Sequence, residues 1–169
     1  MSSQVRSMLA AAVGLLAAAT ASAQVKPGDP FPPLASAGLE GTLPATAGQV
    51  VLVDFWASWC APCKASFPAY ARLQGDYAAR GLVILAVSVD QTASAFTTFV
   101  RRLNPPFPTV RDSGQKLVRA VDVPTMPSSY LVGRDGKVRF VHAGFYGERT
   151  ESELRQEIES LLREKVPPT

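Results

Sequence analysis

The sequence is poor in the residues that build metal sites and disulfide frameworks. Its 169 residues include two cysteines, Cys60 and Cys63, and one histidine, His142. A tetrahedral zinc site needs four ligands, usually two cysteine pairs or a cysteine–histidine set, so such a site is excluded. A disulfide that stabilises a fold usually closes a long loop, because this removes the most disorder from the unfolded chain. The two cysteines are three positions apart, so their spacing indicates redox chemistry or another form of metal binding.

Charged residues are also sparse. They make up 18% of the chain, the formal net charge is +3, and the lysines and arginines are scattered. Proteins that bind nucleic acids gather basic residues on one face, so this class is excluded. The apolar content of 47% is enough for a buried core, and the length suits one domain.

A long apolar run is present only near the start, where residues 8–19 follow the positive charge of Arg6. This run is shorter than the ~20 residues of a membrane-spanning helix. It leads to Ala21-Ser22-Ala23, a small-x-small pattern that predicts cleavage of a secretory signal peptide after Ala23. We therefore predict a signal peptide at residues 1–23 and one domain at residues 24–169, with an uncleaved anchor as the alternative. Export of this kind leads to an oxidising compartment such as the periplasm.

The first half of the predicted domain shows a strand–helix–strand pattern. Residues 24–49, rich in proline and glycine, predict an irregular lead-in. Residues 50–57 and 82–90 are continuous apolar runs, which are typical of strands covered on both faces of a sheet. Between them, apolar residues at three- and four-residue steps predict a helix that begins near Cys60 and ends at Gly81.

The second half adds shorter elements. Ser94 is the predicted cap of a helix that stops at Asn104, and Thr150-Glu151-Ser152-Glu153 is a capping-box pattern at the start of a last helix. Between these two helices we expect a strand at 107–110, a helix at 116–121 and a hairpin of strands at 128–133 and 137–142. The order predicts an α/β fold with a mixed sheet.

Two motifs resemble those of a known family. DFWASWCAPCK at 54–64 is followed by Pro68, and MPSSYL at 126–131 runs into RDGK. Together they resemble the thioredoxin-like superfamily, in particular the exported TlpA/ResA type of thiol-disulfide oxidoreductase. The resemblance spans roughly 31–162. It implies a central mixed sheet flanked by helices on both faces, a helical insert before the third core strand and a short N-terminal extension.

The resemblance implies a redox-active disulfide between Cys60 and Cys63. A cysteine at a helix N-terminus has its pKa lowered below the usual ~8.5, so we expect Cys60 to be the exposed nucleophile and Cys63 to resolve the mixed disulfide. Ala61 and Pro62 place no charge or hydrogen bond near the sulfur. We therefore predict a reductant, with a potential nearer roughly −270 mV than roughly −120 mV.

The resemblance also assigns residues outside the cysteine pair. Asp54, the one polar side chain in its strand, corresponds to the buried acid of thioredoxins and is predicted to be the general acid/base for Cys63 with a raised pKa; the alternative is an aspartate at a strand edge facing water. Pro127 is the predicted cis-proline, with Pro124 as competitor, and it leaves the backbone of Met126 free to pair with substrate. Trp59 is predicted to contact substrate.

The sequence departs from the family pattern at three positions near the site. Ser66 stands where ResA-type proteins often carry an acid, and Asp54 stands where they often have asparagine. Ala86 stands where thioredoxins have a lysine beside the buried acid. These departures weaken a specific assignment to cytochrome c maturation.

The expected partners are disulfide-bearing exported proteins and a membrane-embedded electron donor, with no nucleic acid, and the chain is expected to be a monomer. Two alternatives remain open. One is a copper-binding thioredoxin-like chaperone, although such proteins have CxxxC spacing and a partner histidine. The other is a binding domain whose disulfide is inert.

Overall fold

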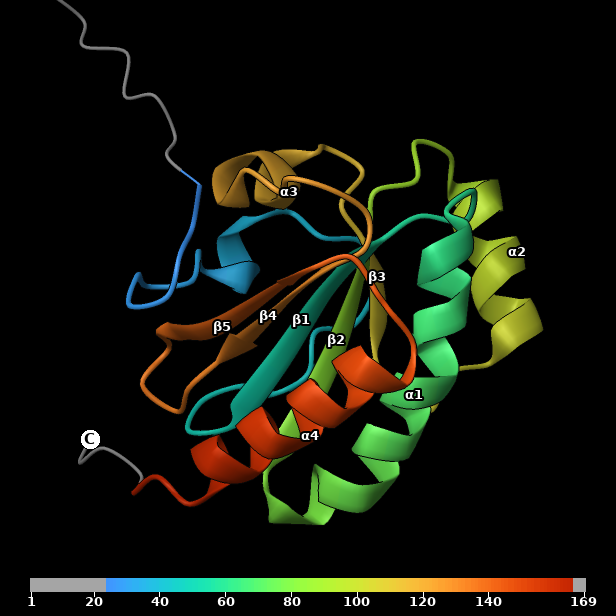
Figure 1. Cartoon of the computed structure of the whole chain (residues 1–169). Helices are drawn as coiled ribbons and strands as arrows, with labels where there is room; N and C mark the ends of the chain where they lie inside the picture. Colours follow the sequence, from blue (N-terminus) through green and yellow to red (C-terminus); the bar gives the residue numbers. More distant parts are fainter. Residues whose placement is uncertain (1–23, 166–169) are drawn as a thin grey trace, which may run out of the picture.

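A computed structural model describes residues 24–165 of the protein, and the predicted signal peptide at residues 1–23 lies outside this part. Five strands form one sheet in the order β3-β2-β1-β4-β5. The central strands β1 and β2 pair in parallel, as do β2 and β3, whereas β4 is antiparallel to both β1 and β5. The predicted mixed sheet is therefore confirmed (Figure 1). The strands are β1 (Val50–Trp56), β2 (Leu82–Ser88), β3 (Thr109–Arg111), β4 (Ser128–Val132) and β5 (Val138–Ala143).

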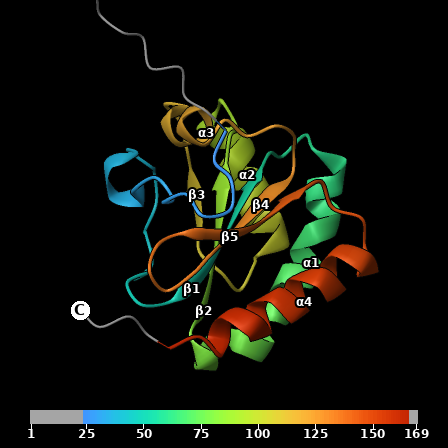
Figure 2. The same cartoon turned by 60° about the vertical axis from the view of Figure 1, so that its left-hand side comes forward.

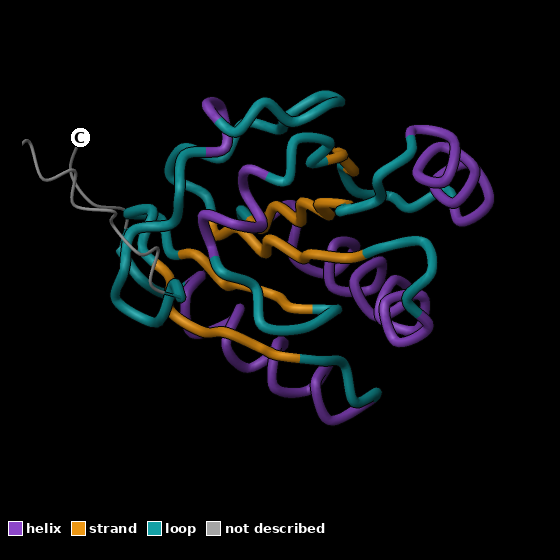
Figure 3. Tube along the Cα trace, turned by 90° about the horizontal axis from the view of Figure 1, so that it is seen from above, coloured by secondary structure: helices purple, strands orange, loops and turns teal. Residues whose placement is uncertain are grey.

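Helices cover both faces of this sheet, as expected. The α-helices are α1 (Ala61–Tyr77), α2 (Ala93–Leu103), α3 (Lys116–Val121) and α4 (Glu148–Leu162), and short 3-10 turns lie at Leu34–Ser36 (η1) and Ala78–Arg80 (η2). Side chains of α1, α2 and α4 pack into one core cluster, and those of α3 and the lead-in pack into a second. Figures 2 and 3 show the sheet between these two layers. α2 is the helical insert expected before the third core strand.

Alternation along β1 decides which layer each of its side chains enters. Val51, Val53 and Phe55 belong to the core cluster beneath α3, whereas Leu52 and Trp56 belong to the cluster beneath α1. Since successive side chains of a strand point to opposite faces, Asp54 points toward α1. This places its carboxyl on the side of the sheet where the cysteine helix lies.

Two predicted helix caps are wrong. Thr92, and not Ser94, caps α2, with its Oγ1 accepting a hydrogen bond from the backbone N–H of Ala95 at 3.4 Å. α4 begins at Glu148, directly after Gly147, whose φ of 66° suits a residue without a Cβ. Thr150 therefore lies inside the helix, and its hydroxyl accepts from the N–H of Tyr146 at 3.0 Å.

Two smaller differences concern element bounds. The strand predicted at 107–110 is displaced to Thr109–Arg111, because Phe107 is buried against the ring of Phe67 at 5.5 Å between centroids. The lead-in is irregular, as predicted, and single bridges join Pro30 to Lys137 and Glu40 to Arg111. None of the helices within residues 24–165 combines the length and the apolar character needed to cross a membrane.

Candidate active site

The two cysteines form a disulfide where β1 passes into α1. Cys60 is the N-cap of the helix, one position before its first residue, and its Sγ accepts a hydrogen bond from the backbone N–H of Cys63 at 3.2 Å. The sulfurs are bonded at 2.07 Å. A helix N-terminus with an N–H aimed at sulfur stabilises a thiolate there once the disulfide is reduced.

The expected exposure of Cys60 is wrong for this disulfide form. Cys60 is 5% exposed and Cys63 is fully buried. Cys60 is thus the more exposed residue of the two by a small margin. Both cysteines belong to the core cluster beneath α1.

A buried aspartate holds the turn before Cys60. Asp90, 2% exposed just beyond the end of β2, accepts hydrogen bonds at 3.1 Å on both oxygens from the N–H of Ser58 and one at 2.8 Å from the Ser58 hydroxyl. The hydroxyl of Ser88 donates to its Oδ2 at 2.8 Å. Sequence reasoning missed this anchor, although an acidic residue at the carboxyl end of a neighbouring strand is a signal that could have found it.

The two tryptophans near the cysteines differ in exposure. Trp56 is fully buried, with its ring 4.5 Å from that of Phe99 and 5.2 Å from that of Phe67. Trp59 is 70% exposed beside Cys60. An exposed indole next to Cys60 is suited to contact a partner surface.

Asp54 is fully buried, so the alternative of a strand-edge aspartate facing water is wrong. Its Oδ1 accepts hydrogen bonds from the hydroxyls of Tyr70 and Ser129, both at 2.9 Å. Its Oδ2 has no partner among the described residues. Burial raises the pKa of Asp54 from 3.8 to about 7, against the opposing effect of the two hydroxyls, which confirms the predicted direction. Tyr70 and Ser129 were not predicted as site residues.

The predicted cis-proline is confirmed, because the Met126–Pro127 peptide bond is cis. Pro127 is buried and precedes β4, whose residue Ser128 pairs with Phe55 near the end of β1. The proline therefore lies at the same end of the sheet as the cysteine turn, where β1 ends and β4 begins. Met126 packs against the cluster that contains the cysteines, and its backbone makes no hydrogen bond within residues 24–165.

Two of the departures from the family pattern, Ser66 and Ala86, are also fully buried. The hydroxyl of Ser66 donates to the carbonyl of Cys63 at 2.9 Å. Ala86 pairs in register with Asp54 across β1 and β2, so no cation occupies that side of the carboxyl. The polar neighbours of the Asp54 carboxyl are therefore the hydroxyl groups of Tyr70 and Ser129, and no lysine lies at the matching position on β2.

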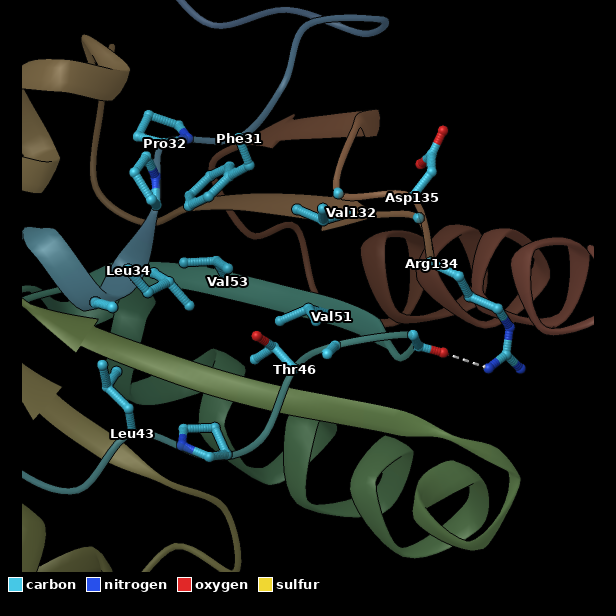
Figure 4. Close-up of a pocket in the computed structure, with 17 residues that line it drawn as sticks. Phe31, Pro32, Leu34, Leu43, Thr46, Val51, Val53, Val132, Arg134 and Asp135 are labelled. Atoms are coloured by element: carbon cyan, nitrogen blue, oxygen red, sulfur yellow. Dashed lines mark hydrogen bonds between the residues drawn. The ribbon is translucent and has the colours of Figure 1, made fainter. Parts of the chain in front are cut away.

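Two other features lie apart from the cysteines. His142 on β5 bonds through Nε2 to Glu157 of α4 at 2.7 Å, and the described residues contain no group of three or more potential ligands able to hold a metal ion. A cavity of about 790 Å³ lies on the opposite face of the sheet, lined by lead-in residues such as Phe31 and Leu43 together with Val51 and Val53 (Figure 4). It includes none of the predicted site residues.

Comparison with known proteins agrees with this geometry. Residues 27–141 match the AhpC/TSA family. The chain belongs to this family. It is 32% identical over 120 residues to the thiol-disulfide oxidoreductase ResA of Bacillus thuringiensis (strain Al Hakam), an alignment that covers 71% of this chain and 65% of the relative. It is 34% identical over 97 residues to ResA of Bacillus subtilis (strain 168), covering 57% and 54%.

Solved structures give the same result. A putative thiol:disulfide interchange protein DsbE from Chlorobium tepidum aligns with a TM-score of 0.76 and 33% identity over 82% of this chain and 99% of that one. StoA from Bacillus subtilis, at 24% identity and a TM-score of 0.58, covers 65% of this chain and 82% of its own, and shares the fold. The thioredoxin-like fold and the resemblance to the ResA type are therefore confirmed. The chain spans just under two thirds of the length of the first curated relatives it matches.

Proposed function

We propose that the protein is a thiol-disulfide oxidoreductase that reduces disulfides in other proteins. The observation that carries this proposal is the Cys60–Cys63 pair at the head of α1, with the N–H of Cys63 on the sulfur of Cys60. Membership of the AhpC/TSA family and the similarity to proteins named thiol-disulfide oxidoreductase support it.

In the proposed reaction, the reduced protein uses Cys60 as nucleophile. Its thiolate attacks one sulfur of a substrate disulfide, the substrate S–S bond breaks, and the departing sulfur takes the electron pair and a proton. Cys63 then loses its proton and attacks the sulfur of Cys60 in the mixed disulfide. The second substrate sulfur leaves reduced, and the protein is left as the Cys60–Cys63 disulfide seen in the structure.

We assign the other predicted residues to supporting roles. Asp54, buried and with a pKa raised to about 7, accepts the proton of Cys63 at neutral pH. Two residues contact the substrate beside the cis-proline Pro127, at the start of β4. They are Trp59, through its exposed indole, and Met126, through its free backbone.

We further propose that the protein is exported and works as a monomer in the periplasm or an equivalent compartment. The pattern at Ala21-Ser22-Ala23 supports export. Disulfides persist in such compartments, so the substrates would be exported proteins that carry them, and each turnover needs electrons from a membrane-embedded donor. The uncharged Ala61-Pro62 pair supports the reducing direction.

The first prediction concerns trapping of the substrate. Cys63→Ser removes the thiol that resolves the mixed disulfide, so we expect the variant to accumulate covalent adducts through Cys60 in the native host. These are measured as bands that dithiothreitol removes, with the partners identified by mass spectrometry. The wild-type protein should reduce insulin disulfides, and Cys63→Ser and Cys60→Ser should both lose steady-state turnover.

Cys60→Ser is the matched control, because it keeps one cysteine but lacks the nucleophile and should give no adducts. Equal trapping by the two variants, or a wild-type disulfide that resists dithiothreitol, would contradict the proposal and leave a binding domain with an inert disulfide. Stoichiometric copper(I) binding that Cys60→Ser abolishes, without insulin reduction, would point to the copper chaperone.

A further inference from the structure

A pair of hydroxyl groups surrounds one oxygen of the buried carboxyl of Asp54. The hydroxyl of Tyr70, from α1, and that of Ser129, from β4, each donate to Oδ1 at 2.9 Å. The two hydroxyl oxygens are themselves 2.7 Å apart, so each restricts the orientation of the other. Oδ1 is thereby fully engaged, whereas Oδ2 has no partner within residues 24–165.

Burial makes these contacts effective. Tyr70 and Asp54 are fully buried and Ser129 is 1% exposed, so no bulk water competes for the carboxyl. Burial and the neighbouring carboxyl raise the pKa of Tyr70 well above its usual range. The phenol therefore keeps its proton over the working pH range and remains a donor to Asp54.

No charged side chain of another element influences Asp54 within the described residues. Burial raises the pKa of Asp54, and the hydrogen bonds from Ser129 and Tyr70 lower it. The register partner of Asp54 on β2 is the uncharged Ala86. Across the sheet, the register partner of Ser129 on β5 is His142, and its ring is paired with Glu157 and Glu153 of α4.

Cys63 shares the helix face with Tyr70. It lies seven residues before Tyr70, about two helical turns, and both are buried in the core cluster beneath α1. The same helix face therefore carries the thiol that must lose a proton and the phenol that holds Asp54.

We propose that Tyr70 and Ser129 are positioning residues for the thiol-disulfide reaction, which hold Oδ1 of Asp54 and leave Oδ2 as the oxygen that exchanges a proton with Cys63. This proposal rests on the proposed function. In the resolving step, the Cys63 thiol gives its proton to Oδ2, and its sulfur forms the bond to Cys60 while the bond from Cys60 to the substrate sulfur breaks. The substrate sulfur leaves with the electron pair and takes up a proton.

Removing one donor should make Asp54 harder to ionise. A hydrogen bond to a charged group is stronger than one to its neutral form, so Tyr70→Phe should raise the pKa of Asp54 by about one unit. The ionised fraction at pH 7 would fall from about one half to about one tenth, and a step that needs the carboxylate would slow about fivefold. At pH 9 the two rates should converge.

The second prediction is tested on the full mature chain by two measurements. Carbon-13 NMR of the Asp54 carboxyl gives its pKa directly, with the signal assigned by its loss in Asp54→Asn. The pH dependence of insulin reduction gives the kinetic midpoint. Tyr77→Phe is the matched control on the same helix, because its hydroxyl bonds to Glu159 at 2.8 Å, away from the site. Ser129→Ala, with Ser128→Ala as its control, repeats the test without changing an aromatic residue.

We expect both measurements to shift upward in Tyr70→Phe and Ser129→Ala and to stay unchanged in the two controls. An unshifted Asp54 carboxyl in folded Tyr70→Phe or Ser129→Ala overturns the proposal, and so does a raised carboxyl pKa with an unchanged kinetic midpoint. If Tyr70→Phe does not fold, Ser129→Ala alone decides. A wild-type protein that fails to reduce disulfides would defeat the proposed function instead, while the NMR titration would still report whether the hydroxyls control Asp54.

Discussion

At the scale of single residues, Asp54 is held where its charge opposes folding. Its folded-state pKa of about 7 lies above the ordinary value of 3.8. Between these two values the folded protein keeps a proton that the unfolded chain has released. The free energy of unfolding contributed by this group therefore falls as pH rises through that window and is constant above it.

The third prediction follows from this sign. Asp54→Asn cannot ionise, and its side-chain oxygen can still accept from Tyr70 and Ser129. The oxidised variant should therefore be more stable than wild type at pH 8, by up to about 4 kcal/mol for a shift of about three units, and close to wild type at pH 4. Urea unfolding at the two pH values measures the difference.

Activity should change in the opposite direction. Asp54→Asn should slow insulin reduction and flatten its pH profile near neutrality, because the variant has no carboxylate to accept the proton of Cys63. A variant with wild-type stability at pH 8 would contradict the raised pKa, and one with a wild-type pH profile would contradict the role of Asp54 in catalysis.

At the scale of elements, the junction between β1 and α1 is held from outside the helix. Asp90 at the end of β2 fixes the backbone of Ser58, and the buried guanidinium of Arg111 donates to the carbonyls of Asp90 and Gln91 at 3.3 and 3.0 Å. Arg111 also pairs with Glu40 of the lead-in. The position of the cysteine turn therefore depends on β2, β3 and the lead-in as well as on its own residues.

The fourth prediction separates the two candidate caps of α2. Thr92→Ala removes the side-chain acceptor of the Ala95 N–H, so it should lower the free energy of unfolding by about 1 kcal/mol. Ser94→Ala, at the second residue of the helix, is the matched control and should change it by less than about 0.5 kcal/mol. Urea unfolding at one pH compares them, and an equal loss in both variants would contradict the assignment of Thr92 as the cap.

At the scale of the whole molecule, the sheet separates the site from the second core. The cysteines and Trp56 lie with Asp54 on the α1 side, and the lead-in with its cavity lies on the other side (Figure 4).

The fifth prediction concerns maturation. Expressed from its full sequence in an exporting bacterial host, the protein should be recovered outside the cytoplasm with Gln24 as its first residue. N-terminal sequencing of the fractionated protein measures this. Ala23→Tyr, which removes the small residue before the predicted cleavage point, should retain the uncleaved form. Recovery of the uncleaved wild-type chain in the membrane fraction would instead support an anchor.

Local chemistry was sufficient for much of this protein. The order of elements, both parallel central strands and the cysteine helix follow from apolar runs and from motifs whose residues are neighbours in the chain. The cis bond before Pro127 was predicted from the family resemblance that these motifs carry. Patterns of this kind are readable because burial in a strand or helix imposes a short repeat on the sequence.

Tertiary structure alone decided the rest, because it depends on contacts between distant residues. The hydroxyls of Tyr70 and Ser129 reach Asp54 across 16 and 75 positions of sequence, and Asp90 reaches Ser58 across 32. Tyr70 fits a core pattern on its helix, and nothing near it in the chain shows that its hydroxyl meets a buried carboxyl. The sequence by itself thus pointed to the cysteine pair at the head of a helix, and packing between that helix and the sheet determined which groups surround the buried acid.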